Sequence, residues 1–185
     1  MSVQVALLRG VMPTGRNRVP VAELKALLDD LGFTDVRTLL ATGNAVFRSE
    51  GPKGAELEAL LERSIEAKIG PRLDVMVRDA AQWKRIVAGN PFPEDAAEHP
   101  SKLLAVVLKA KPTAEGARAF EAAIVAPEKA KVVGDVAWAV FADARSLGKM
   151  LAPAAMKRTL GASGTARNWN TVLKIRDAVE TLAAA

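Results

Sequence analysis

The order of apolar patterns along the chain constrains its fold more than any other feature. Residues 3–8 are largely apolar, as in a buried strand, and apolar residues then recur at helical spacing from Val21 to Leu31, where Gly32 is placed to end the helix. Strand-like segments follow at 35–40, 45–48 and 73–78, with a second helix predicted over 53–69 between the last two. This β-α-β-β-α-β order is that of the ferredoxin-like split βαβ arrangement.

A similar order returns after residue 101. We predict a strand at 102–108, a helix after Pro112, and two strands, 131–133 and 136–141, around Gly134-Asp135. Ser146–Leu160 is predicted to be helical with a break at Pro153, and Thr165 to cap a final helix. The second half therefore reads β-α-β-β-α-α, close to a copy of the first.

These patterns predict an α+β protein of two tandem ferredoxin-like (βαββαβ-type) lobes packed together. Between the two patterns, the proline-containing segment 89–101 is predicted to be a linker. The predicted domains are a first lobe at 1–88 and a second lobe with a C-terminal helix at 102–185. A chain of 185 residues is long enough to bury a substantial core, as one domain or as two small ones in close contact.

The amino-acid composition limits the possible site chemistry and the cellular location. The chain contains no cysteine, which excludes disulfides, thiolate nucleophiles and cysteine-ligated metals. No apolar stretch approaches the roughly 18 residues needed to span a membrane, and the first residues read as a strand rather than as a signal peptide. We therefore expect a cytoplasmic protein without membrane contact.

The positive charge is unevenly distributed. Residues 1–95 carry 13 basic and 13 acidic side chains, whereas residues 96–185 carry 13 and 8, so the net charge of +5 lies in the second half. Between Ala144 and Arg176 there are seven basic residues and no acid. A field of one sign attracts phosphates, carboxylates or nucleic acid. The same residues also fit an ordinary solvated surface whose acidic partners lie elsewhere in the fold.

The loop between the first strand and the first helix is the first candidate site. Arg9, Gly10, Arg16 and Arg18 lie in it, and no acid occurs before Glu23. Exposed N–H groups and the positive end of a helix dipole favour anions at such places, although no Gly-Lys-Ser/Thr follows as in a Walker loop. The alternative is a plain β-to-α connection with surface arginines.

The predicted start of the last helix is the second candidate. Arg167, Asn170, Thr171 and Lys174 are spaced i, i+3, i+4 and i+7, so they would share one helix face. A donor-rich stripe near a helix N-terminus is suited to an anionic group. The alternatives are a solvated face, or a pairing of Arg167 with a carboxylate of the other lobe.

Three weaker signals carry little chemistry. Ser146 and Lys149 have Ser-x-x-Lys spacing, but serine is also a favoured helix cap. His99 is the only histidine, and its neighbouring carboxylates have neither the number nor the spacing of a metal site. The chain has no tyrosine and few phenylalanines, a poor supply for stacking nucleic-acid bases. We predict no metal and no cofactor.

Several segments, taken together, resemble one bacterial family, the domain of unknown function 1697. They are Val5-Ala6-Leu7-Leu8-Arg9-Gly10, Val19-Pro20-Val21-Ala22-Glu23-Leu24, Leu31-Gly32-Phe33-Thr34-Asp35-Val36-Arg37-Thr38, Thr42-Gly43-Asn44-Ala45-Val46-Phe47 and Thr165-Ala166-Arg167-Asn168-Trp169-Asn170-Thr171-Val172. The resemblance implies two tandem α+β lobes of ferredoxin-like kind. It does not point to any particular activity or catalytic residue.

The chain departs from the family pattern in two places. The first loop typically reads close to Gly-Ile-Asn-Val-Gly-Gly, whereas here it is Gly10-Val11-Met12-Pro13-Thr14-Gly15. An aromatic residue and a His or Tyr usually lie near the second-half strand, where this chain has Trp138-Ala139-Val140-Phe141-Ala142-Asp143. Any site formed by the first loop would therefore differ in shape from that of its relatives.

Two functions remain open at this point. The first is a binding module that holds a phosphorylated small molecule or a nucleic-acid backbone in a cleft between the lobes, lined by Arg9, Gly10, Arg16, Arg18, Asn44, Arg167, Asn170 and Lys174. The second is an enzyme acting on a phosphorylated or carboxylated small molecule, with arginines orienting the substrate. No residue pattern identifies a catalytic acid or base, and the oligomeric state is not specified.

Overall fold

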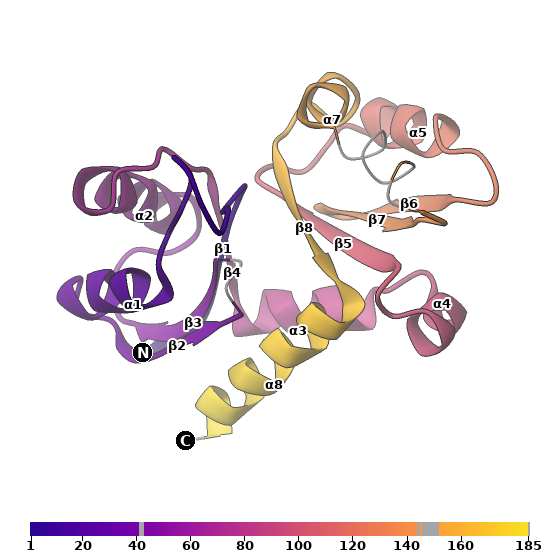
Figure 1. The fold of residues 1–185 in the computed structure, drawn as a ribbon. Helices are drawn as coiled ribbons and strands as arrows, with labels where there is room; N and C mark the ends of the chain where they lie inside the picture. Colours follow the sequence, from indigo (N-terminus) through magenta and orange to yellow (C-terminus); the bar gives the residue numbers. More distant parts are fainter. Residues whose placement is uncertain (41–42, 144, 146–151, 185) are drawn as a thin grey trace. The chain divides into compact units, whose positions relative to one another are not determined.

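The computed structural model describes residues 1–40, 43–143, 145 and 152–184, and it contains two compact units (Figure 1). The first unit comprises residues 1–87 and 173–185, and the second comprises residues 88–172. Each has a four-stranded antiparallel sheet with helices, which confirms the predicted α+β class. The predicted domain limits stay a prediction; the units differ from them chiefly in dividing the last helix at Leu173.

The first unit has the order β-α-β-β-α-β followed by a further helix. Its sheet order is β2-β3-β1-β4, and both neighbours of the central strand β1 run antiparallel to it. The elements are β1 (Ser2–Leu8), α1 (Val21–Asp30), β2 (Thr34–Leu39), β3 (Asn44–Ser49), α2 (Gly54–Lys68), β4 (Val75–Asp79) and α3 (Ala80–Ala88).

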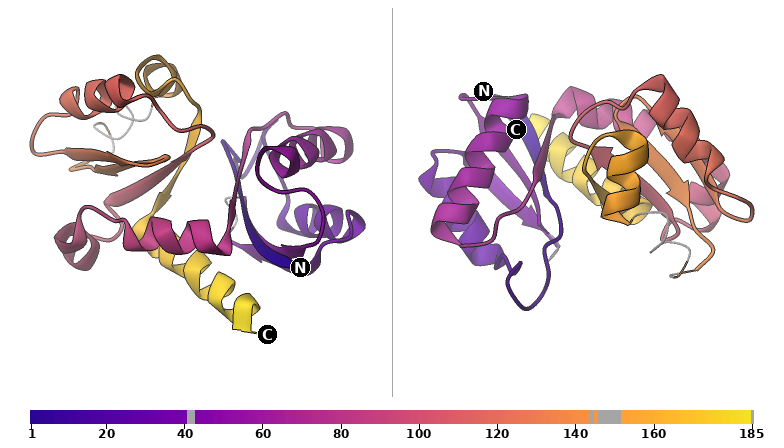
Figure 2. Two further views of the ribbon diagram at one scale, coloured as in Figure 1. Left: turned by 180° about the vertical axis from the view of Figure 1, so that it is seen from behind. Right: turned by 90° about the horizontal axis from the view of Figure 1, so that it is seen from above.

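Helices α1 and α2 cover one face of this sheet, as Figures 1 and 2 show. The apolar stripes found in the sequence provide the contact, because Leu24 and Leu28 of α1 and Leu61 of α2 are buried with Phe47 of β3 in one core. Helix α1 ends as predicted at Gly32, whose φ of 81° and bond to the Asp29 carbonyl belong to a Schellman motif.

The second unit repeats the same order. Its elements are α4 (Pro93–Glu98), β5 (Leu103–Leu108), α5 (Ala114–Ala122), β6 (Lys129–Val133), β7 (Val136–Val140), α7 (Pro153–Leu160), β8 (Gly164–Asn168) and the start of α8 (Trp169–Ala184). The sheet order is β6-β7-β5-β8. Phe120 of α5 and Met156 and Leu160 of α7 pack on Val106 and Leu108 of β5.

The prediction that Thr165 caps the last helix is wrong. Residues 164–168 form strand β8, which pairs with β5 in the register Leu108↔Gly164 to Leu104↔Asn168. The helix begins only at Trp169, and Asn168 is its cap, accepting the Thr171 N–H at 3.0 Å. A local pattern cannot reveal pairing with a strand some 60 residues away along the chain, so it predicts the cap three residues too early.

With β8 present, the two units follow the same order to their ends. In both, the fourth strand leads directly into a helix capped by an Asx residue: Asp79 Oδ1 accepts the Gln82 N–H at 2.7 Å, just as Asn168 does for Thr171. The residue before each cap is a buried arginine, Arg78 or Arg167. The two units therefore resemble each other in more detail than the sequence pattern predicted.

Three further predictions concern the linker, the segment before α7 and membrane spans. The predicted linker contains helix α4, which Lys129 of β6 holds through a 2.8 Å ion pair to Asp95. The predicted helical stretch 146–151, with the Ser146–Lys149 pair, lies outside the described residues, as does Thr42 of the predicted hairpin turn. Among the described residues, no helix has both the length and the apolar character needed to cross a membrane.

Candidate functional site

The eight predicted binding residues are divided between the two units. The first unit contains Arg9, Gly10, Arg16, Arg18, Asn44 and Lys174, and the second contains Arg167 and Asn170. The prediction that they line a common cleft stays a prediction. Each group is considered below within its own unit.

Arg9 already has an anionic partner. It follows the end of β1, and its Nη1 lies 3.0 Å from Oδ2 of Asp74, the residue before β4. The backbone joins the same two residues, because the Arg9 N–H donates to the Asp74 carbonyl at 2.9 Å. Arg9 therefore ties two neighbouring strand ends together, and its charge is largely compensated.

The loop after Arg9 projects its basic side chains into solvent. It turns back on itself, since the Met12 N–H donates to the Asn17 carbonyl at 3.0 Å and the Arg18 N–H to the Gly15 carbonyl at 3.3 Å. Arg16 and Arg18 are exposed. Within the described ranges, neither guanidinium makes an ion pair or a hydrogen bond. The loop thus carries two uncompensated positive charges.

The base of the loop is fixed by the hairpin between β2 and β3. The Leu8 N–H donates to the Gly43 carbonyl at 2.8 Å, and a Cβ at this glycine would lie 2.8 Å from both Leu8 Cβ and Val11 Cγ2. Only glycine allows the Leu8 and Val11 side chains to come this close to the backbone. The φ of 72° at this position also favours glycine. Asn44 beside it is buried and donates from Nδ2 to the Leu39 carbonyl at 2.9 Å, so it closes the hairpin.

The predicted polar stripe on the last helix does not include Arg167. That residue lies on β8, buried, where Nη1 donates to Thr165 Oγ1 at 2.7 Å and to the Ala166 carbonyl at 2.9 Å. Burial lowers the pKa of Arg167 to about 10, which still leaves the guanidinium protonated at pH 7. Asn170 and Lys174 are exposed on α8.

Sequence reasoning missed the counterpart of Arg167 in the first unit. Arg78 of β4 is buried, donates from Nη1 to the Val77 carbonyl at 2.7 Å and lies 3.8 Å from Oε1 of Glu58. A signal was available, since Arg78-Asp79 and Arg167-Asn168 each combine an arginine with a helix-capping residue at the end of a strand.

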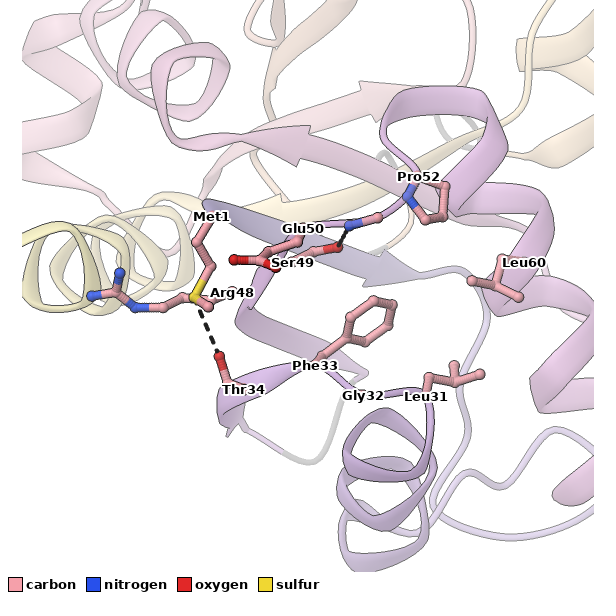
Figure 3. A pocket seen from close by; sticks show the side chains of 11 residues that line it. Met1, Leu31, Gly32, Phe33, Thr34, Arg48, Ser49, Glu50, Pro52 and Leu60 are labelled. Atoms are coloured by element: carbon pink, nitrogen blue, oxygen red, sulfur yellow. Dashed lines mark hydrogen bonds between the residues drawn. The ribbon is translucent and has the colours of Figure 1, made fainter.

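The first unit also contains two surface pockets that sequence reasoning did not find. One, of about 330 Å³, lies where the start of β2, the end of β3 and α2 meet; Figure 3 shows its lining side chains. The other, of about 290 Å³, includes Asp74 together with Glu62, Glu66, Arg63 and Arg72. Its three carboxylates, Glu62, Glu66 and Asp74, repel an anion. The loop that carries Arg16 and Arg18 is therefore the better candidate for an anion site.

Comparison with known proteins identifies a family and a similar fold. A model of the family described as "Protein of unknown function (DUF1697)" matches residues 1–138. The conserved bacterial protein SP0830 from Streptococcus pneumoniae has a similar structure, with a TM-score of 0.68 over 96% of this chain and 98% of that one, at 19% identity. That likeness concerns the fold alone. No curated protein matches the chain.

Proposed function

Because the chain belongs to the family of unknown function DUF1697, we propose a function from its own residues: the first unit binds a phosphate-bearing ligand through the loop of residues 10–18. The observation that carries the proposal is the pair of exposed arginines, Arg16 and Arg18, without a carboxylate partner among the described residues. Guanidinium groups form forked, charge-assisted bonds with phosphate oxygens, which makes them suited to this ligand.

The backbone of the loop supports the same proposal. Its two internal hydrogen bonds and its packing on Gly43 hold it in one shape, so less conformational entropy is lost on binding. The loop leads into α1, whose first residue follows Pro20 and whose N-terminus has no side-chain cap. The positive end of that helix adds to the attraction for an anion.

The composition of the loop favours binding over catalysis. Residues 10–18 contain no acid and no histidine, so the loop supplies charge and N–H donors but no group for proton transfer. Arg9 and Asn44 serve the fold, through Asp74 and the Leu39 carbonyl respectively. The proposed binding site therefore includes fewer residues than the eight named from the sequence.

Each unit, we further propose, is a ferredoxin-like lobe. In support, both have the order β-α-β-β-α-β, and both sheets place the first strand between the third and the fourth, with all pairs antiparallel. Such lobes host many activities, so this part of the proposal concerns the architecture alone. The proposed ligand rests on the loop of residues 10–18.

Binding of pyrophosphate and of a 12-nucleotide single-stranded DNA tests the function. We expect the double variant Arg16→Ala/Arg18→Ala to bind either probe about five- to tenfold more weakly, because two charge-assisted contacts are lost. For the DNA, two contacts correspond to a slope of log K against log[salt] of about −1.4. Tighter DNA binding with a much steeper slope would indicate a nucleic-acid ligand, and preference for pyrophosphate a small one.

The matched control removes two exposed arginines elsewhere. Arg85→Ala/Arg118→Ala changes the net charge by the same amount, and both side chains are exposed on helices, α3 and α5. We expect this variant to bind like the parent. Equal losses in the two double variants would show that only overall charge matters, and the proposal would be wrong.

A further inference from the structure

The fourth strands of the two sheets differ at their outer edges, although the two units follow the same order. In the first unit, the Val77 N–H donates to Oε1 of Glu58 on α2 at 2.9 Å. The Val75 N–H donates in the same way to Oε1 of Glu62, also at 2.9 Å. The guanidinium of Arg78 lies at this edge, with Nη1 2.7 Å from the Val77 carbonyl oxygen and 3.8 Å from Oε1 of Glu58. Two carboxylates and a guanidinium therefore close the edge of β4.

The outer edge of β8 lacks those carboxylates. Strand β8 pairs with the end of β5 in the same register in which β4 pairs with the end of β1, so Gly164 and Ala166 are equivalent to Val75 and Val77. In this register, the Gly164 and Ala166 N–H groups point outward, away from β5. Both residues are half-buried, and no side chain in the described part of the chain accepts a hydrogen bond from either N–H group.

Arg167 brings a positive charge to this open edge. It holds the place of Arg78, and its Nη1 donates to the Ala166 carbonyl at 2.9 Å. The carbonyl and the N–H of one strand residue lie on the same edge, so the guanidinium is beside the Ala166 N–H. A carboxylate that bound this N–H as Glu58 binds that of Val77 would therefore also face a guanidinium, in the charge-assisted arrangement that favours anions.

Helix α7 offers no acid to fill this position. Lys157 follows the buried Met156 of α7 just as Glu62 follows the buried Leu61 of α2, so the shared topology puts it on the side of its helix nearest the strand edge. It is exposed, and its ammonium group makes no ion pair or hydrogen bond with any described residue. Residues 144–176 contain no acid. The second unit therefore supplies positive charge where the first supplies two glutamates.

We propose that the outer edge of β8 binds a small dicarboxylate, which takes the place that Glu58 and Glu62 fill in the first unit. Those glutamates are the structural precedent for carboxylates at this edge. One carboxylate accepts the Ala166 N–H and pairs with Arg167, and the other accepts the Gly164 N–H. Two N–H groups two residues apart on a strand are separated by about 7 Å, which a five-carbon dicarboxylate can span. The site lies in the second unit, apart from the proposed phosphate site.

A nitrogen-15 NMR titration with glutarate tests the proposal. The backbone amides of Gly164 and Ala166 are the proposed donors, and we expect both signals to shift saturably, with a Kd on the order of 1 mM for so small a ligand. Glutaramide has the same chain length without the charges, and we expect it to bind about fivefold more weakly or worse. The variant Arg16→Ala/Arg18→Ala should bind glutarate like the parent, so the two proposed sites are tested independently.

A carboxylate added to α7 should compete with the ligand. Lys157→Glu introduces an acid at the helix position of Glu62, and we expect it to weaken glutarate binding about fivefold or more. Arg158→Glu makes the same charge change at the next exposed residue, on another face of the helix, and should change the Kd about twofold at most. The proposal is overturned if these two variants behave alike, if glutaramide binds as tightly as glutarate, or if neither amide signal shifts.

Discussion

Two buried arginines hold the same place in the two units. Arg78 and Arg167 each donate from Nη1 to the carbonyl of the preceding residue on their own strand, at 2.7 and 2.9 Å. Each is followed by the Asx residue that caps the next helix. A charged group is costly to bury unless it is hydrogen-bonded, and the lowered pKa of Arg167 reports that cost. The repeated geometry indicates that both arginines fix the junction between the fourth strand and its helix.

Gly164, the first residue of β8, tests how closely this strand packs on β5. A Cβ here would lie 2.8 Å from Leu108 Cδ2, 2.9 Å from Val106 Cγ1 and 3.2 Å from the Val107 carbonyl oxygen. Gly164→Ala should lower the free energy of unfolding by about 1–3 kcal/mol, because β8 must move away from β5. Urea denaturation measures it.

Gly51→Ala is the matched control, since a Cβ there meets only Ser49 Oγ at 3.9 Å. We expect its stability to remain within about 0.5 kcal/mol of the parent. A Gly164→Ala variant as stable as this control would show that β8 does not approach β5 so closely.

At the scale of elements, glutamates cover the outer edges of two edge strands. On β4, the Val75 and Val77 N–H groups donate to Glu62 and Glu58 of α2, both at 2.9 Å. On β6, the Val132 N–H donates to Glu121 of α5 at 2.8 Å. Free N–H groups on a sheet edge invite pairing with another chain, and these carboxylates satisfy them. Both units thus protect an edge strand with the helix packed beside it.

The edge contact of Glu121 has a pH signature. Its hydrogen bond from the Val132 N–H, more than the ion pair with Lys131, lowers the pKa of Glu121 below its ordinary value of 4.5. The contact therefore stabilises the fold above about pH 4.5, and this stability is lost as the pH falls through the lowered pKa. Glu121→Gln should be less stable by about 1 kcal/mol at pH 7 and show a shallower acid slope.

Unfolding at a series of pH values measures this, with the exposed Glu66→Gln as control. If Glu121→Gln and the parent lose stability in parallel between pH 5 and 3, the edge contact contributes nothing to folding.

The elements also show how far a single sequence leads. Helices α1 and α2 and the four strands of the first sheet were predicted, because each has an apolar pattern of its own and turn residues such as Gly32. Strand β8 was missed because its apolar content is low and its partner β5 is distant in the sequence. The loop arginines Arg16 and Arg18 were predicted, but the pairing of Arg9 with Asp74 and the pocket beside Phe33 depend on contacts that no local pattern encodes.

At the scale of the whole molecule, the end of the chain belongs to the unit that contains its beginning. Residues 173–185 are part of the first unit, and the Leu182 carbonyl accepts a hydrogen bond from Arg48 of β3. Ile175, Val179 and Leu182 are buried. The C-terminal part of α8 therefore contributes to the stability of the first unit.

Leu182→Ala tests that contribution. The side chain is 1% exposed, so its truncation should lower the free energy of unfolding by about 2–5 kcal/mol. Glu180→Ala on the exposed side of α8 is the control, with an expected change below about 0.5 kcal/mol. Similar midpoints for both variants in thermal unfolding would contradict burial of this helix end.

The most direct measurement of the central claim observes the guanidinium groups themselves. In a nitrogen-15 NMR titration with pyrophosphate, we predict that the side-chain Nε–H signals of Arg16 and Arg18 shift together and saturate, while that of the exposed Arg118 in the second unit does not move. If the Arg16 and Arg18 signals stay in place while the protein binds pyrophosphate, the loop of residues 10–18 is not the anion site.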